Sequence, residues 1–417
     1  MRYFIISFGF LSVVLCVIFP LSALAEGDDL YSFNADEFTK KNWEWKGEVT
    51  ITGTGKQFYQ SSKIYPIRFP DEAETKSQEF DAQVVINSRW DWGWSRFYLN
   101  GDAWVTRSYI SDFDDEDVFL REGYWQLSEY DPHSLEIGKR LLRWGKGYAF
   151  NPVALLERAK DPENPEASRE GLWLVQGIWI PGAMLGFDSS SLTLIYLPER
   201  DNINQDYQLD NNDENAWGLK LYALIGTTDI DLYYVTRAES DETNLGADFA
   251  SNIMPNFEVH GEVANTTSPG EDYYLALLGL RYLTENEVTW IVEGYHDSSG
   301  LTREESISLY ESARILPPSK AISVLRQLQQ QKTINRNYGY VKASVKEPFD
   351  WLYFTPGISW LGNLDDESYN IISQLSYEPS TNWTFQAYWQ YFSGSENSQY
   401  GEGLVKDKLE VAVSYAF

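Results

Sequence analysis

The residues best suited to do chemistry lie together in one basic stretch of an otherwise acidic chain. The stretch "GKRLLRWGKGYAFNPVALLERAKDPENPEASREG" spans 138–171. Its cationic side chains are Arg140, Arg143, Lys146, Arg158, Lys160 and Arg169. In a pore, such cations would form a constriction that passes anionic or polar solutes. The same stretch could instead be a rigid loop held by ion pairs with its own acids, namely Glu157, Asp161, Glu163 and Glu170.

Other kinds of chemistry find little support. The three histidines, His133, His260 and His296, have no recognisable Ser or Asp partner motif, so we expect no enzyme. "WGKG" lacks the spacing of a phosphate-binding loop, and no acidic loop has EF-hand spacing. Cys16 is the single cysteine, so thiolate metal sites are not expected. We therefore expect no metal and no cofactor. A net charge of −29 argues against a nucleic-acid partner, which needs a basic surface.

The first 25 residues resemble an export signal. Arg2 precedes an apolar run, and "SALA" places small residues at Ala23 and Ala25 in the pattern of a cleavage site. Cleavage there would remove Arg2 and Cys16 and leave a net charge of −30. The rest of the chain has no run of about 20 apolar residues. We therefore predict a cleaved signal peptide over 1–25 and a short N-terminal segment over 26–42.

Alternation of apolar and polar residues dominates from residue 43 onward. In "LEVAVSYAF" (409–417) large residues alternate with small or polar ones, which is typical of a strand with two different faces. About 18 such segments follow one another. They begin near residues 43, 78, 94, 118, 134, 171, 190, 215, 229, 245, 256, 273, 287, 337, 351, 368, 382 and 408. All but the tenth reach the ~9–11 residues that a tilted transmembrane strand needs.

The connections between these strands alternate in length. Short turns such as "PGAM" (181–184) and "TENE" (284–287) alternate with longer polar segments, notably 146–170 and 298–336. This parity is typical of an outer-membrane barrel. We therefore predict an all-β, transmembrane antiparallel β-barrel over 43–417, with about 18 strands and both termini in the periplasm. Aromatic residues at the short-turn ends, including Trp92, Phe349 and Trp351, fit an interfacial belt.

If the apolar face meets lipid, the polar face lines the lumen. Charges assigned to that face are nearly balanced, so the excess negative charge must lie mainly in loops. Our candidates for pore-lining or constriction residues are Arg96, Asp102, Glu136, Arg140, Arg143, Lys146, Arg158, Glu258, His260, Glu262, Arg281 and Glu293. The 298–336 segment reads as helical over 301–316 and again over 319–331, and we slightly favour its folding into the lumen.

Several short motifs resemble a known group of Gram-negative outer-membrane barrels. They are "GKR" (138–140) followed by "RWGKG" (143–147), "FEVHGEV" (257–263) and "WIVEGY" (290–295). The chain is similar to the alginate-export-like and related porin-like families, which implies a conduit of roughly 18 strands. Phe417 resembles the signal read by the barrel-assembly machinery. An alginate exporter would be expected to have a strongly basic lumen, whereas this lumen is balanced, so general solute passage is favoured.

Our functional hypothesis is therefore an outer-membrane channel, or porin, for small hydrophilic solutes. Its expected partners are outer-membrane lipid and lipopolysaccharide, the assembly machinery through Phe417, and the solutes themselves. The alternative is a partner-dependent conduit that exports a polysaccharide or sheathes a periplasmic electron carrier, so a periplasmic partner is left open.

Overall fold

The computed structural model describes residues 42–62, 65–69, 74–108, 115–128, 133–183, 186–198, 203–204, 215–238, 240–315, 320 and 332–417. The expected signal peptide and N-terminal segment lie outside these ranges. Within them, no helix is long and apolar enough to cross a bilayer.

The described residues form 18 strands and a few short helical elements, with starts within about three residues of those predicted. The strands are β1 (Trp43–Phe58), β2 (Lys76–Asp91), β3 (Ser95–Ser108), β4 (Asp115–Leu127), β5 (Ser134–Arg140), β6 (Leu172–Trp179), β7 (Ser189–Leu197), β8 (Ala216–Ile225), β9 (Thr228–Arg237), β10 (Thr243–Met254), β11 (Phe257–Ser268), β12 (Glu271–Leu283), β13 (Val288–Asp297), β14 (Asn337–Val345), β15 (Phe354–Asn363), β16 (Ser368–Tyr377), β17 (Trp383–Ser393) and β18 (Val405–Ala416). The helical elements are α2 (Tyr65–Arg68), α3 (Arg303–Ile315) and the 3-10 turn η2 (Pro348–Asp350).

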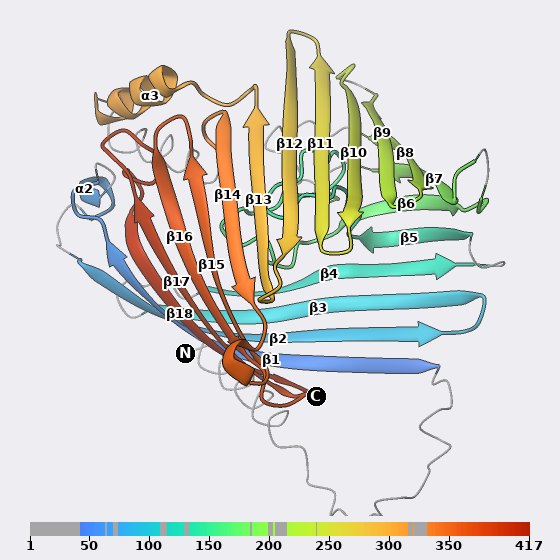
Figure 1. The fold of residues 1–417 in the computed structure, drawn as a ribbon, viewed down its shortest axis with the longest axis horizontal. Coiled ribbons are helices and arrows are strands. Elements are labelled where there is room, and N and C mark those ends of the chain that lie inside the picture. The colour runs from blue at the N-terminus through green and yellow to red at the C-terminus, as the bar shows by residue number, and fades with distance from the viewer. Residues whose placement is uncertain are drawn as a thin grey trace, which may run out of the picture.

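The strands close into one antiparallel barrel. Each strand pairs with its neighbours in sequence, and β1 pairs with both β2 and β18 (Figure 1). At the closing pair, the Gly47 and Phe417 backbones donate to each other at 3.0 and 2.9 Å. A Cβ on Gly47 would lie 2.3 Å from the Phe417 ring, so glycine leaves room for that ring. The stretch "LEVAVSYAF" therefore forms part of β18 and closes the barrel against the first strand.

The burial pattern of the strands is that of a barrel with an apolar exterior. Large apolar side chains such as Leu278 (63% exposed), Val411 and Leu194 point outward and are accessible, although they would be buried in an ordinary soluble sheet. Polar side chains on the alternate positions point inward, including Glu262 and His260 of β11. This alternation follows from the period of two along a strand.

The connections follow the predicted parity, with some corrections. We call the two ends of the barrel the short-turn end, where β2 meets β3, and the long-loop end, where β1 meets β2. The parity predicts a long connection between β11 and β12, but these strands extend to a tight turn at 269–270, so that prediction is wrong. β5 and β6 have 7 and 8 residues, fewer than expected, because the chain leaves the barrel wall after Arg140.

The helix predicted within 298–336 forms, but it does not enter the barrel. α3 lies beyond the strand ends at the long-loop end (Figure 1). Its Tyr310 and Ala313 pack with Ile334 of the same connection, and Arg303 donates to the Asp365 carbonyl in the connection between β15 and β16 at 3.0 Å. Because α3 buries its apolar side against its own loop, the preference for inward folding is wrong for this helix. The second predicted helix lies outside the described residues.

Candidate functional site: a segment folded into the lumen

The segment between β5 and β6, residues 141–171, folds into the barrel and packs against the inner wall. Two apolar clusters anchor it. In the first, Trp144, Val153 and Leu156 contact inward-facing residues of neighbouring strands, which are Leu172, Leu174, Ile195, Leu197, Ala216, Tyr233, Val235 and Ala264. In the second, Ala149 and Phe150 contact Leu277, Ile291, Tyr338, Tyr340, Leu361 and Tyr400. The inner wall therefore carries two apolar patches where the segment packs against it.

The backbone of 141–149 is neither helix nor strand, so its N–H groups need other acceptors. Glutamates supply them. Leu141 N–H donates to Glu122 at 3.0 Å. The next N–H groups donate in pairs, each pair to one glutamate. Arg143 and Trp144 donate to Glu157 at 2.7 and 2.9 Å, and Lys146 and Gly147 donate to Glu262 at 2.6 and 2.5 Å. Tyr148 and Ala149 both donate to Glu293, Ala149 at 2.8 Å.

Three of these four acceptors, Glu122, Glu262 and Glu293, belong to barrel strands. A carboxylate that accepts backbone N–H groups makes charge-assisted bonds, which are about twice as strong as neutral ones. The lumenal acids therefore act first as attachment points for the inward segment. The backbone N–H groups of this segment therefore bind carboxylates of the protein itself.

Two glycines of "RWGKG" explain how the chain passes so close to Glu262. Gly145 has φ +91°, and a Cβ there would lie 2.7 Å from a Glu262 carboxylate oxygen. A Cβ on Gly147 would lie 2.3 Å from the Phe150 carbonyl oxygen. Only glycine permits both the left-handed conformation and this approach.

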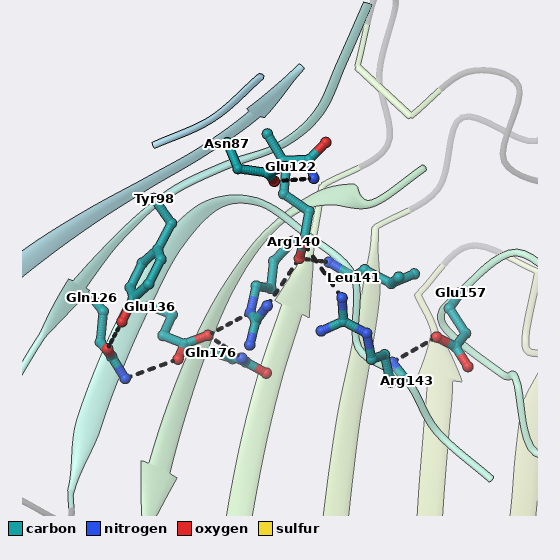
Figure 2. A network of polar contacts seen from close by, with 11 residues as sticks. Asn87, Tyr98, Glu122, Gln126, Glu136, Arg140, Leu141, Arg143, Glu157 and Gln176 are labelled. Atoms are coloured by element: carbon teal, nitrogen blue, oxygen red, sulfur yellow. Dashed lines mark hydrogen bonds and ion pairs between the residues drawn. The ribbon is translucent and has the colours of Figure 1, made fainter. Parts of the chain in front are cut away.

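Arg140 lies at the base of the segment, between two carboxylates (Figure 2). It donates to Glu122 at 2.9 Å and to Glu136 at 3.1 Å, and its guanidinium lies 4.4 Å from the centre of the Tyr124 ring. Gln126 and Gln176 also donate to Glu136. The charge of Arg140 is thus compensated and its position fixed.

Arg143 differs from Arg140 in its exposure. Its side chain is 61% exposed and lies 3.6 Å from Glu122, whereas the Arg140 side chain is 22% exposed. Its backbone is left-handed, with φ 58°, and is held by the Glu157 carboxylate. Of the constriction bases in this segment, which are Arg140, Arg143, Lys146 and Arg158, Arg143 therefore has the most exposed side chain.

Ion pairs hold Arg158 and Arg169 of the segment, and the Lys160 ammonium donates to the Gly147 carbonyl. Arg158 pairs with Glu170 at 3.1 Å and Arg169 with Glu157 at 3.2 Å, as the rigid-loop interpretation predicts. Asp161 and Glu163 instead pair with Lys332, which follows α3 in the long-loop connection, at 2.9 and 3.4 Å. Burial alone would lower the pKa of Lys332, but Glu163 and Asp161 raise it above its ordinary value. The segment is fixed to itself, to the wall and to a neighbouring loop.

The other candidates are distributed around the inner wall. Arg96 pairs with Asp91 at 3.4 Å, and Asp102 is held by Arg121 at 2.7 Å. Lys146 pairs with Asp231 at 2.8 Å.

On β11–β13, a second group of candidates surrounds Tyr148 of the segment. Glu258 lies opposite Arg281 in register and accepts from the Tyr148 hydroxyl at 3.3 Å. His260 contacts Glu293 at 2.9 Å.

Five of the candidates do not line an open surface. Asp102, Glu136, His260, Glu262 and Glu293 are each at most 4% exposed. Sequence reasoning missed this because it treated every inward polar residue as solvated. The sequence did contain an indication that part of the wall is covered. β6 and β7 read "LWLVQGIW" and "SSSLTLIYL", with apolar residues on both faces. Such a pattern is expected where another segment of the chain covers the inner face of a strand. Glu122 and Asp231 were assigned to the lumenal face but not proposed as candidates, and the positioning residue Arg121 was not identified.

The inner faces of β1, β2 and β3 carry a different, polar surface. Here the side chains bond with one another: Gln83 donates to Asp102 at 2.8 Å, and Asn100 to Asn87 at 2.6 Å. Thr50 of β1 is bonded to Ser414 of β18 at 2.7 Å. The described lumen therefore has a covered side, mainly over β5–β15, and a side lined with neutral polar groups and compensated charges.

No protein-family model and no curated protein sequence matches the chain. Solved barrels do. OccK5 (OpdH) of Pseudomonas aeruginosa is 10% identical, with a TM-score of 0.54 over 90% of this chain and 98% of that one. The chain shares this fold. OccK9 (OpdG) of the same organism is 8% identical with a TM-score of 0.55, again over 90% and 98%. OccAB4 of Acinetobacter baumannii is 11% identical with a TM-score of 0.55 over 91% and 99%.

Proposed function

We propose that this protein is an outer-membrane porin that passes small hydrophilic solutes through its lumen. The observation that carries the proposal is a closed barrel with an apolar exterior and an inward-folded segment that narrows a polar interior. An 18-strand barrel is wide enough to hold water unless something fills it. The segment 141–171 covers one part of the inner wall, and the polar surface of β1–β3 would line the remaining route.

The neighbours in fold support this proposal. The Occ barrels are outer-membrane porins, and the porin-like part of the family resemblance agrees with them. We do not extend the proposal to alginate export. The described lumenal bases are largely compensated, as at Arg140, and a polyanion conduit would need uncompensated cations.

The location and orientation of the barrel belong to the same proposal. The exposed belt of large apolar side chains fits a lipid environment. The short-turn end would face the periplasm, because porin barrels have short periplasmic turns and longer outer loops. Lipid, lipopolysaccharide and the assembly machinery through Phe417 are its proposed partners, and residues 1–25 its proposed export signal.

Single-channel recording in planar bilayers tests the function directly. We expect the purified chain alone to give sustained steps of open current. A folded barrel that inserts into the bilayer but conducts only after a periplasmic partner is added would refute the porin and support the partner-dependent conduit.

A further inference from the structure

Trp104 of β3 faces the lumen, and the fold leaves it partly uncovered. It lies opposite Gln83 of β2 and Asp117 of β4 in register, on the inward face that also carries Asp102. Its side chain is partly exposed. In the described part of the chain, no other ring packs against its indole and no acceptor binds the indole N–H. Trp104 therefore offers a flat apolar face and a hydrogen-bond donor to whatever enters the lumen.

Gln83, which lies beside Trp104 across the β2–β3 pair, offers the complementary acceptor. Its amide nitrogen donates to the Asp102 carboxylate at 2.8 Å. Among the described residues, no donor binds its carbonyl oxygen. An open donor and an open acceptor thus lie on directly opposed residues, whose Cβ atoms are about 4.5–5.5 Å apart in such a pair. Hydroxyl groups can satisfy both, because each of them donates and accepts.

A bulge in β4 completes this surface and neutralises it. Arg121 is an extra residue in the register between β3 and β4, and such residues re-aim side chains. The Arg121 guanidinium binds both oxygens of Asp102, at 2.7 and 2.8 Å, and lies 5.7 Å from the centre of the Phe119 ring. The carboxylate that Gln83 contacts is therefore already compensated. We call Gln83, Asp102, Trp104 and Arg121 the Trp104 surface.

The charges near the Trp104 surface favour a neutral solute. The inward bases in the long-loop half of β1–β4, Lys56 and Arg121, are each paired with an acid, so an anion finds no free cation on these strands. A cation could approach the exposed Asp117, but it has no group that accepts from the indole N–H. A neutral solute that carries hydroxyl groups meets both conditions.

The Trp104 surface borders the inward segment. The Arg121 guanidinium donates to the Ser168 carbonyl at 3.2 Å, and residues 166–168 of the segment are exposed. A solute that passes between the segment and β2–β4 would therefore cross the Trp104 surface where the lumen is narrowed.

We infer that the Trp104 surface binds neutral saccharides and selects them as solutes of the channel. A pyranose ring has a flat face of C–H groups that can lie on the indole. Its hydroxyl groups can accept from the indole N–H of Trp104 and donate to the carbonyl of Gln83. This inference rests on the proposed porin function and names the class of solute for it.

Block of the open current by added solutes tests this inference. We would record the purified chain in planar bilayers with cellobiose, a neutral disaccharide, and separately with sorbitol, gluconate and choline, which are a linear polyol, an anion and a cation. The variants are Trp104→Ala and Trp104→Phe. Trp290→Ala is the matched control, because Trp290 is 41% exposed on the outer face of β13.

We expect cellobiose to block the wild-type channel saturably and at lower concentration than the other probes. Trp104→Ala should raise the half-blocking concentration at least about fivefold. Trp104→Phe should raise it less, and Trp290→Ala should leave it unchanged. A conducting Trp104→Ala channel with the wild-type half-blocking concentration would overturn the inference, as would stronger block by gluconate or choline. If the wild-type chain gives no open current, the proposed porin function itself fails.

Discussion

Replacing Glu262 with Gln should release the inward segment from the wall without changing the volume of the side chain. The Glu262 carboxylate accepts N–H groups from Lys146, Gly147 and Val153 at 2.6, 2.5 and 3.3 Å. One of its oxygens takes the first two, and the other takes the third. An amide can present only one oxygen, so its NH₂ group must face a remaining donor.

The size of the effect follows from these bonds. Bonds to a charged acceptor contribute about 1.5–3 kcal/mol each, and neutral ones about half as much. Halving two such bonds and leaving one buried donor unpaired should cost about 2.5–6 kcal/mol in the free energy of local opening. At a factor of ten per 1.4 kcal/mol, that corresponds to roughly 60- to 20,000-fold faster exchange of the amides involved.

Hydrogen exchange followed by mass spectrometry on the folded barrel measures this opening. Peptides that cover 143–153 should lose protection in Glu262→Gln, while strands β1–β3 keep theirs. Glu285→Gln, in the exposed turn 284–287, is the matched control and should change neither. Unchanged protection of 143–153 in a folded Glu262→Gln barrel would refute the role assigned to this carboxylate.

Three further predictions concern the same segment. Gly145→Ala places a methyl group on a left-handed backbone, 2.7 Å from a Glu262 carboxylate oxygen. It should therefore lower the free energy of opening of the segment by at least about 1–3 kcal/mol and make residues 141–171 sensitive to trypsin. Resistance to trypsin equal to that of the wild-type protein would contradict this. Arg143→Ala should shift reversal potentials toward cations more than Arg96→Ala does, because Arg143 is the more exposed base; equal shifts would exclude a special role for Arg143. Burial alone would lower the pKa of Lys332, but its two acids raise it above 10.5. The ion pairs of Lys332 should therefore stabilise the segment fully below pH 10.5 and be lost as the pH rises through the raised pKa. Proteolysis of the segment, measured at a series of pH values, should accelerate there in the wild-type protein. Lys332→Met should remove this acceleration.

Much of the architecture could be read from local pattern. Three patterns depend only on neighbours in sequence: the period of two along the strands, the parity of the connections, and the aromatic residues at strand ends. For that reason the 18 strands and their outward apolar face were predictable, and so was the helix at 303–315. The closure through Gly47 and Phe417 was predictable too, because a membrane barrel admits no free edge.

The candidate site was only partly predictable. The sequence identified 138–171 as distinctive but left open whether its charges formed a constriction or a rigid loop. The structure shows the ion pairs of the rigid loop and leaves Arg143 exposed. Of the two connections considered for narrowing the lumen, 141–171 enters the barrel and α3 does not.

The sequence by itself determined the barrel, since strand period and turn parity are local properties and lipid demands that every backbone group be paired within the sheet. The tertiary structure decided the use of the lumenal acids. Glu262 and Glu293 lie more than 100 residues from the N–H groups that they accept, so no local pattern could show that these carboxylates hold a segment in place instead of lining the pore.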